Sequence, residues 1–392
     1  MSAFAFRMLS SMNEVTRAAW DALLDERATP FLRWDFLAAM EAGGCVGAVA
    51  TGDWLPRHLT LWRGERLVAA APAYLKQGSD GDFARDWDWA SAAQRAGIRF
   101  YPKLCVTVPF TPATGRRFLI AADVDRTAAL RALLDGAIAT AKSGKATTVQ
   151  VLFPLPDEAA ELEALGMAIR LSYQFHWKND KYTKLQDFLD RLDAKKRHQQ
   201  KRERAAPATQ GITIRTLRKA ELDANPVQWA HTAYALHRAT IDKLPWGRGW
   251  LTERFYEIVF AKMSDNIELV VAEREGHVIA GAVNVASRTR LYGRYWGCFE
   301  DHPFLHFNVC LYHSIDECIA RGTLVFEGGA GGEHKLARGF EPSETYSAHL
   351  FFHPRLDVAL RSHLAGETAS IKEGIADWRS RKSLLKDALV DG

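Results

Sequence analysis

Two segments of the chain, about 200 residues apart, share the same pattern of hydrophobic and polar positions. Residues 59–76 and 267–287 each contain two short apolar runs on either side of a polar turn, Arg-Gly-Glu in the first segment and Arg-Glu-Gly in the second. Short β-rich runs around a tight polar turn are typical of a β-hairpin. The pattern therefore predicts one hairpin in each half of the chain.

Each predicted hairpin is followed by further strands, then a helix, then a strand. The helices are expected at residues 126–144 and 306–322, and the strands that follow them at 147–153 and 323–328. Both helices end at a glycine, which commonly caps a helix C-terminus. The sequence thus predicts a duplicated α/β unit with mixed sheets, and the period is too long for a solenoid.

A strongly basic segment separates the two halves. Seven of the fourteen residues from Arg191 to Arg204 are Lys or Arg, and they point all round a helix, so that no apolar face is left. We expect a solvated bridging helix that ends near Pro207. It is either a charged connector or a phosphate-facing strip. The predicted division is a first domain at 1–190, a connector at 191–210 and a second domain at 211–392.

Composition narrows the class of protein without naming a function. The chain has 392 residues, of which 47% are hydrophobic, and its formal net charge of +4 does not by itself indicate a nucleic-acid partner. Five cysteines without a CxxC motif indicate reduced thiols and a cytoplasmic location. The sequence shows neither a signal peptide nor an apolar run long enough to span a bilayer.

The segment 324–340, LVFEGGAGGEHKLARGF, changes from an apolar strand to glycine and then to charge. Four glycines follow Glu327 within five residues. Glycine permits positive φ and lets another group approach the backbone. The segment is neither a P-loop nor a GxGxxG motif, and the chain also lacks GxSxG and HExxH.

Other residue patterns suggest candidate sites. His302, His306 and His313 would share a face of one continuous helix, but Pro303 and the lack of a fourth ligand favour a buried histidine or a catalytic base over a metal site. As a regular strand, 290–301 would place Tyr292, Arg294 and Trp296 on one face, and its glycines indicate a bulge or a close backbone approach. Trp246, Arg248 and Trp250 form either an aromatic and basic rim for a substrate or a packed loop.

Taken together, these residues resemble a known family. Two copies of hairpin, strands, helix and strand resemble a tandem GNAT fold, and FEGGAGGEHKLARGF resembles the close of the second domain in FemAB-type proteins. TPFLRWDFLAAME at 29–41 is similar to the N-terminal Phe-containing helix of that family. The nearest subgroup is the FemAB-like proteins described as peptidoglycan biosynthesis or recognition proteins and predicted N-acyltransferases.

The resemblance implies transfer of an acyl or aminoacyl group to an amine, from aminoacyl-tRNA or acyl-CoA and with no tightly bound cofactor. The acceptor would be a small molecule or a peptide, with a peptidoglycan-precursor peptide as one candidate. A CoA pyrophosphate normally needs successive backbone N–H groups at a helix N-terminus. Neither VPFTPATGRR nor EDHPFLHFNVC provides the glycines for this, which favours tRNA or another donor. At the tail, Ala337 and Glu341 depart from the family pattern.

This chemistry needs a base for the amine, donors for the oxyanion and an acid for the leaving group. Glu327 and His306 are alternative bases, Tyr295 is the candidate acid, and the strand from Gly293 to Gly297 could supply N–H donors. The expected substrate-binding residues are Arg294, Trp246, Arg248, Asn308, His334, Lys335 and Arg338. Of these, Lys335, Arg338 and Arg294 are the candidates to hold phosphates.

Two other functions stay open. One is a non-catalytic GNAT-like module that recognises a muropeptide or nucleic acid, which the missing pyrophosphate loops favour. The other is an RNA-binding protein that uses the strip from Lys195 to Arg204, for which RNA affinity should fall steeply with salt.

Overall fold

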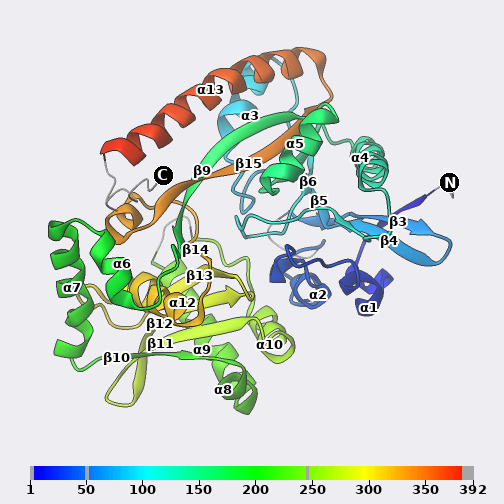
Figure 1. Cartoon of the computed structure of the whole chain (residues 1–392). Helices are drawn as coiled ribbons and strands as arrows, with labels where there is room; N and C mark the ends of the chain where they lie inside the picture. Colours follow the sequence, from blue (N-terminus) through cyan, green and yellow to red (C-terminus); the bar gives the residue numbers. More distant parts are fainter. Residues whose placement is uncertain (1–3, 49–52, 244–246, 382–392) are drawn as a thin grey trace. The chain divides into compact units, whose positions relative to one another are not determined.

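The computed structural model describes residues 4–48, 53–243 and 247–381, which form two compact units (Figure 1). The first unit comprises residues 1–172, 250–255 and 344–371, and the second comprises 173–249, 256–343 and 372–392. Four elements have residues in both units: β9 (Ala168–Lys178), α10 (Glu253–Lys262), β15 (Glu341–Phe351) and α13 (Pro354–Arg381). The division at 190 and 210 stays a prediction, and these units group the residues differently.

The first unit contains a four-stranded antiparallel sheet in the order β1-β3-β4-β7. Its strands are β1 (Ala5–Leu9), β3 (His58–Arg63), β4 (Arg66–Ala71) and β7 (Leu119–Ile120). Strands β3 and β4 form the predicted hairpin, and Gly64 in its turn has a φ of 62°. The first hairpin prediction is therefore confirmed.

A second group of strands in the first unit, part of a larger sheet, pairs in the order β15-β8-β6-β5-β2. Its other strands are β2 (Leu55–Pro56), β5 (Ala73–Lys76), β6 (Lys103–Val106) and β8 (Thr148–Leu152), and β6 and β8 pair in parallel. The helices are α1 (Arg17–Asp21), α2 (Trp34–Ala42), α3 (Trp87–Arg95), α4 (Arg126–Ser143) and α5 (Pro156–Ala164), with short 3₁₀ turns at Met12–Glu14 and Pro30–Leu32. Helix α4 and strand β8 match the prediction for the first half.

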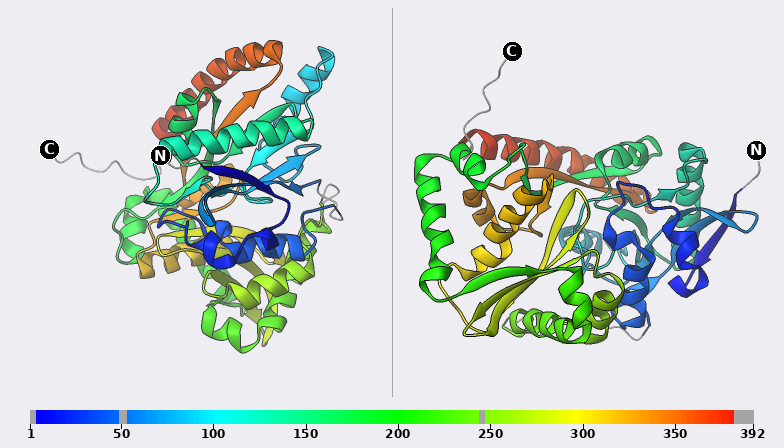
Figure 2. Two further views of the ribbon diagram at one scale, coloured as in Figure 1. Left: turned by 90° about the vertical axis from the view of Figure 1, so that its right-hand side faces the viewer. Right: turned by 60° about the horizontal axis from the view of Figure 1, so that its bottom comes forward.

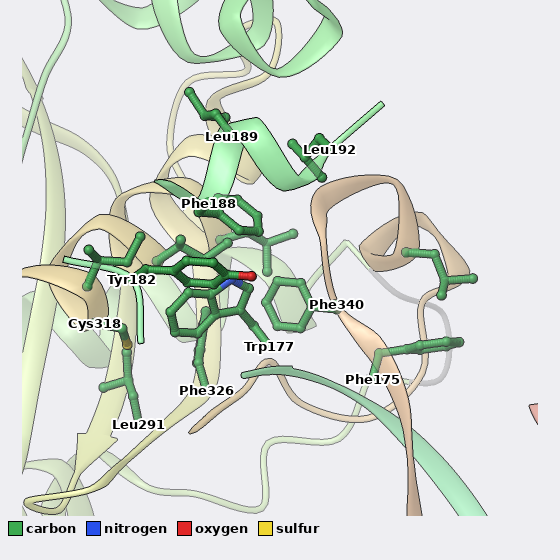
Figure 3. Close-up of a cluster of buried hydrophobic side chains, with 14 of the residues drawn as sticks. Phe175, Trp177, Tyr182, Phe188, Leu189, Leu192, Leu291, Cys318, Phe326 and Phe340 are labelled. Carbon is green, nitrogen blue, oxygen red and sulfur yellow. The ribbon is translucent and has the colours of Figure 1, made fainter. Parts of the chain in front are cut away.

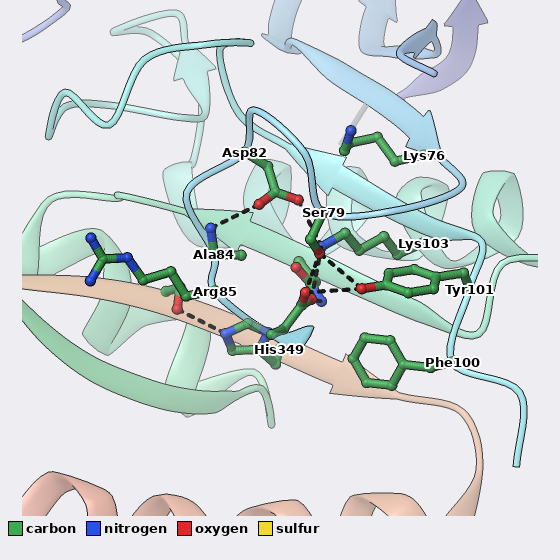
Figure 4. A network of polar contacts seen from close by, with 12 residues as sticks. Lys76, Ser79, Asp82, Ala84, Arg85, Phe100, Tyr101, Lys103 and His349 are labelled. Carbon is green, nitrogen blue, oxygen red and sulfur yellow. Dashed lines mark hydrogen bonds and ion pairs between the residues drawn. The ribbon is translucent and has the colours of Figure 1, made fainter. Parts of the chain in front are cut away.

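A buried polar network fixes the loop before α3 to strand β6 (Figure 4). The Nζ atom of Lys103 lies 2.7 Å from a carboxylate oxygen of Asp82 and 2.7 Å from one of Asp86. Gln150 of β8 donates to the same Asp86 oxygen over 2.9 Å. All four side chains are almost completely buried, so this network stabilises the unit only while it is fully paired.

The second unit is built on a sheet in the order β10-β11-β12-β13-β14-β9. Its strands are β10 (Thr213–Leu217), β11 (Ile267–Arg274), β12 (His277–Ala286), β13 (Arg290–Cys298) and β14 (Val325–Glu327). All neighbours pair antiparallel except β13 and β14, which are parallel. Strands β11 and β12 form the second predicted hairpin, which is confirmed.

Helices cover both faces of this sheet (Figures 1 and 2). Helix α9 (Pro226–Ile241) packs on one face so closely that a Cβ on Gly297 would lie 1.7 Å from the Leu236 carbonyl oxygen. The other face carries α11 (Leu305–Phe307), the π-helix η3 (Asn308–Tyr312) and α12 (His313–Arg321). Shorter elements complete the unit: α6 (Leu185–Arg191), α8 (Lys219–Ala224) and the 3₁₀ helix η4 (Glu333–Arg338).

An aromatic core joins the end of the sheet to α12, α6 and η4 (Figure 3). Trp177, Phe326 and Phe188 are completely buried, and Phe340 packs against Phe326 with ring centroids 5.4 Å apart. Phe340 is the last residue of the glycine-rich segment 324–340. This core therefore anchors the segment at its C-terminal end.

The basic segment forms helix α7 (Ala194–Thr209), so the predicted helix is confirmed but its environment is not. The helix continues through Pro207 and belongs to the second unit. It buries Gln200, Glu203 and Pro207, because polar groups of the π-helix and of η4 supply partners for this face. The expectation of a helix solvated on all sides was wrong for this reason.

Among the described residues, no helix combines the length and the apolar character needed to cross a bilayer.

Candidate active site

Strands β13 and β14 separate at a bulge, and this separation defines the candidate site. Their parallel ladder runs only from Arg290 to Tyr292 on β13 and ends at Glu327 on β14. One residue further along, the register between β12 and β13 shifts: Asn284 faces Gly293 and Val283 faces Tyr295. Arg294 is therefore the extra residue of a β-bulge, the feature predicted from the glycines. Beyond it, β13 continues to Cys298 without pairing to β14.

The bulge corrects the predicted distribution of side chains along β13. Tyr292 lies opposite Val285 on the α9 face, whereas Trp296 packs in the core under η3. Tyr292 and Trp296 were expected on one face, and the inserted residue places them on opposite faces. Tyr295 and Gly297 share the α9 face.

The glycine-rich segment folds back against the bulge. Gly329, Gly331 and Gly332 have φ values of 81°, 71° and 89°, which favour glycine strongly. A Cβ on Gly329 would lie 3.4 Å from the carbonyl oxygen of Gly293. The group that comes close to these glycines is thus partly the protein's own backbone.

Lys335 braces this segment from inside. Its Nζ atom donates to the carbonyl oxygens of Gly329 and Gly331, each over 2.8 Å. The residue is only 5% exposed, and burial lowers the pKa of its ammonium group to about 8. A buried lysine with a lowered pKa is a typical feature of functional sites, although structural lysines also show it.

Arg338 lies in the 3₁₀ helix η4, as Lys335 does, and connects this helix to α7. Its Nη2 atom donates to Glu203 over 2.9 Å and its Nη1 atom to the carbonyl oxygen of His334 over 2.8 Å. The guanidinium also lies 3.3 Å from the centre of the Phe307 ring. Lys335 and Arg338 thus both have protein partners, and their expected role in holding a phosphate stays a prediction.

Glu203 is a central residue of this network that the sequence analysis did not single out. It accepts a hydrogen bond from the Tyr312 hydroxyl over 2.6 Å, and its backbone carbonyl accepts one from Asn308 over 2.8 Å. Burial would raise the pKa of the Glu203 carboxyl, but hydrogen bonds from Tyr312 and Gln199 and the charge of Arg338 leave it lowered. The only sequence signal is one acidic residue near the end of a basic run.

Glu327 stands at the end of β14 on the α9 face, opposite His176 of β9. Its side chain is 3% exposed and accepts a hydrogen bond from Arg290 over 2.7 Å. The Nε2 atom of His176 lies 3.9 Å away. Burial lowers the pKa of His176 even though the charge of Glu327 opposes this, so the histidine is neutral at pH 7. The carboxylate is thus buried beside one arginine.

His306, the alternative base, lies on the other face of the sheet. Its ring packs against Trp296 at 5.0 Å and lies 6.2 Å from the ring of His334. Although His306 is exposed, desolvation by its neighbours and the charges of His334, Arg338 and Lys335 lower the pKa of its imidazole to about 4. Such an imidazole is a weak base near neutral pH.

Tyr295 shares the α9 face with Glu327 and packs against the ring of His237 at 4.5 Å. The guanidinium of Arg294 lies 5.3 Å from the Tyr295 ring. Arg248 is exposed in a loop of the second unit, and Trp246 lies outside the described residues. The structure therefore places Glu327, Tyr295 and Arg294 around the bulge on one side. On the other side it places His306, Asn308, His334, Lys335 and Arg338.

The three histidines with helical spacing do not come together. His302 contacts Gln210 and Glu300, whereas His313 contacts Thr216 over 2.8 Å. The helix begins only at Leu305, after Pro303, which explains the difference. In the parts of the chain that the structure describes, no group of three potential ligands could hold a metal ion.

The chain thus folds into two α/β units, and in the second unit a bulged strand separates from its parallel neighbour. The protein belongs to the FemAB-like family of peptidoglycan biosynthesis/recognition, whose pattern matches residues 11–386. No curated protein is significantly similar in sequence.

Among solved structures, FemX is similar at a TM-score of 0.51, with 13% identity over 88% of this chain and 98% of FemX. A tandem GNAT protein from the clavulanic acid biosynthesis pathway gives 0.45, with 14% identity over 90% and 99%. L-PGS from Bacillus licheniformis gives 0.48, with 9% identity over 83% and 95%. At such identities only the fold can be compared, and the likeness to FemX agrees with the predicted α/β fold in two domains.

Proposed function

We propose that the protein transfers an acyl or aminoacyl group from an activated donor to an amine, and that the reaction takes place where β13 and β14 separate. The observation that carries this proposal is the bulge at Arg294 beside the buried carboxylate of Glu327. Backbone N–H groups of β13 at the bulge are the proposed donors to the oxyanion. Glu327 accepts the proton of the attacking amine, and Tyr295 is the acid for the leaving group.

Lys335 supports this site by shaping the glycine segment that follows Glu327. Its two hydrogen bonds to carbonyl oxygens hold Gly329 against the bulge. The exposed side chains of His334 and Arg248 are the candidates to contact an anionic substrate. A peptidoglycan-precursor peptide is the proposed acceptor, because the family is described by peptidoglycan biosynthesis or recognition.

The donor is proposed to be aminoacyl-tRNA rather than acyl-CoA. The helix after β13 begins at Leu305, and the residue before it, Phe304, has a φ of 62° and no side-chain cap. A CoA pyrophosphate is normally bound by successive N–H groups, often of glycine, at such a terminus. The bulky residues from Pro303 to Leu305 do not offer this arrangement.

The test compares equilibrium binding of acetyl-CoA and of a charged tRNA pool, followed by turnover with an amine-bearing muropeptide. We expect Glu327→Gln to reduce turnover by about 100-fold or more, the usual contribution of a general base, with donor affinity unchanged. Glu333→Gln is the control, because Glu333 is an exposed carboxylate at the start of η4. Equal turnover by the two variants would refute the role of Glu327.

A non-catalytic recognition module is the second candidate function. It is favoured by the internal pairing of Lys335 and Arg338, which leaves these cations less available to a substrate. Muropeptide binding without turnover from either donor would support this alternative and would overturn the transferase proposal.

A further inference from the structure

Helix α7 has one face that the protein buries and one that it exposes. Gln200, Glu203 and Pro207 are buried, and at 100° per residue they lie within an arc of about 60° around the helix axis. Glu203 fixes this face through its contacts with Arg338 and Tyr312. The opposite face is therefore presented to solvent in a defined orientation.

The exposed face carries three strong cations, which together form a cationic strip. Lys195, Lys201 and Arg202 are exposed and lie within an arc of about 120° on the side opposite Glu203. His198 is also exposed and lies between them. Because the helix rises about 1.5 Å per residue, the three cations are spread over about 10 Å of its length.

Neighbouring carboxylates do not neutralise the cationic strip. Among the residues that the structure describes, none of the three cations has an ion-pair partner, whereas Asp190 at the end of α6 pairs with Arg197 over 3.2 Å. Asp193 caps the helix by accepting a hydrogen bond from the amide of Lys196 over 2.8 Å. Glu203 is the one acidic residue between Ala194 and Thr209, and it is buried. A helix face that is merely solvated often carries both signs of charge, but this face carries one.

The remaining exposed residues of α7 indicate a polyanion rather than a membrane as the partner. They are small or polar: Ala194, Ala205, Ala208 and Thr209. A helix that binds in a membrane interface inserts large apolar side chains, and α7 exposes none. The phosphates of a nucleic acid need only cations at a suitable spacing, and about 10 Å along a duplex contains about three phosphates of each strand.

We propose that the cationic strip of α7 holds the sugar–phosphate backbone of the donor tRNA. This rests on the proposed function, in which the donor is aminoacyl-tRNA, and adds the surface that binds the body of that donor. Contacts from Lys and Arg to phosphates position a nucleic acid without reading its sequence, so that tRNAs of different sequence bind alike. The buried face of the same helix connects to η4, which follows Glu327 in the chain, and all these elements belong to the second unit.

Fluorescence anisotropy of the full-length protein with a labelled pool of uncharged tRNA tests the proposal. Affinity is measured between about 50 mM and about 200 mM KCl, because each phosphate contact contributes about 0.7–0.9 to the slope of log affinity against log salt concentration. The triple variant Lys195→Gln/Lys201→Gln/Arg202→Gln should make this slope shallower by about 2. At the lowest salt concentration it should bind tRNA at least about tenfold more weakly.

A control variant with the same change in net charge separates a local contact from a general charge effect. Arg95→Gln/Arg131→Gln/Lys142→Gln removes three exposed cations of the first unit, and its slope should equal that of the wild type. Equal slopes for the wild type and the α7 variant, or an equal change in the control variant, would overturn the proposal. Binding to phosphatidylglycerol vesicles that depends on the strip, without binding to tRNA, would also overturn it and would indicate a membrane partner.

Two further results distinguish a failure of this proposal from a failure of the proposed function. If the wild type binds no tRNA at about 50 mM KCl, both the proposed donor and the role of the strip are refuted. If the wild type binds tRNA and the α7 variant binds it equally well, only the role of the strip is refuted. With charged tRNA as the donor, the α7 variant should raise KM at least about tenfold and leave kcat unchanged, since it removes uniform binding, whereas Glu327→Gln should lower kcat.

Discussion

Replacing Glu203 by glutamine should loosen the glycine-rich segment without touching it directly. The carboxylate and its partner Arg338 are 2% and 6% exposed and lie 2.9 Å apart. Removing one partner of a buried ion pair leaves the other charge buried and uncompensated, which costs about 3–5 kcal/mol. Because the glutamine amide can still accept the hydrogen bond from Tyr312, we expect a loss near the lower end, about 3 kcal/mol.

Hydrogen exchange of backbone amides is the suitable assay, because a chain of two units need not unfold in a single step. A loss of about 3 kcal/mol corresponds to exchange at least about 100-fold faster in residues 334–340 if local opening governs it. The pH dependence provides a second criterion. Since the pKa of Glu203 is lowered by folding, its contribution is present above the unfolded value of about 4.5. The difference between wild type and variant should therefore shrink as the pH falls below that value.

Asp123→Asn serves as the control for this experiment. Asp123 pairs with Arg66 over 2.7 Å, but both side chains are more than half exposed. Exposed pairs contribute little to stability, so exchange should be unchanged. Exchange in residues 334–340 of Glu203→Gln at the wild-type rate would refute the view that this ion pair holds η4 in place.

The remaining predictions concern single buried groups. The pKa of Lys335 is about 8 in the folded protein and 10.5 in the unfolded chain, so the unfolded chain binds more protons between these values and wild-type stability should rise with pH there. Lys335→Met should abolish this rise, which urea unfolding across the pH range measures. Gly339→Ala should destabilise more than Gly331→Ala in urea unfolding: both have positive φ, but only at Gly339 would a Cβ meet another residue, 2.4 Å from Phe188. Lys103→Met should destabilise the first unit by about 3–5 kcal/mol at pH 7. The loss should be smaller in acid, because the carboxylates that the variant leaves without Lys103 can then protonate, and the exposed Lys142→Met should have no effect.

Local patterns were sufficient to predict much of the fold. The hairpins at β3–β4 and β11–β12 follow from alternating apolar runs and short polar turns, which are properties of neighbouring residues. The same holds for α4 and for the Gly322 cap of α12, whose φ is 66°. The pattern did not predict the π-helix at Asn308–Tyr312, because its extra residue depends on contacts with α7 rather than on helix propensity.

The candidate site was predicted less completely, because its chemistry depends on pairs that are distant in the sequence. A basic run alone predicts a helix that is solvated on all sides. One face of α7 is buried because Glu203 contacts Arg338 and Tyr312, which lie more than 100 residues away in the sequence. Similarly, a one-residue bulge moves Tyr292 and Trp296 to opposite faces, and no periodicity reveals which residue is inserted.

The glycine-rich segment shows the same limit most clearly. Its residues predict positive φ and a close approach, and both occur, but the sequence does not say what approaches. The structure supplies the carbonyl oxygen of Gly293 and the stem of Lys335, which are internal groups. A segment that needs glycine for its own packing can still lie beside a reaction, because the same folding places Glu327 at the end of β14, next to the bulge. The turnover of Glu327→Gln therefore tests the proposed function, whereas the stability of the glycine variants tests packing. Neither measurement can replace the other.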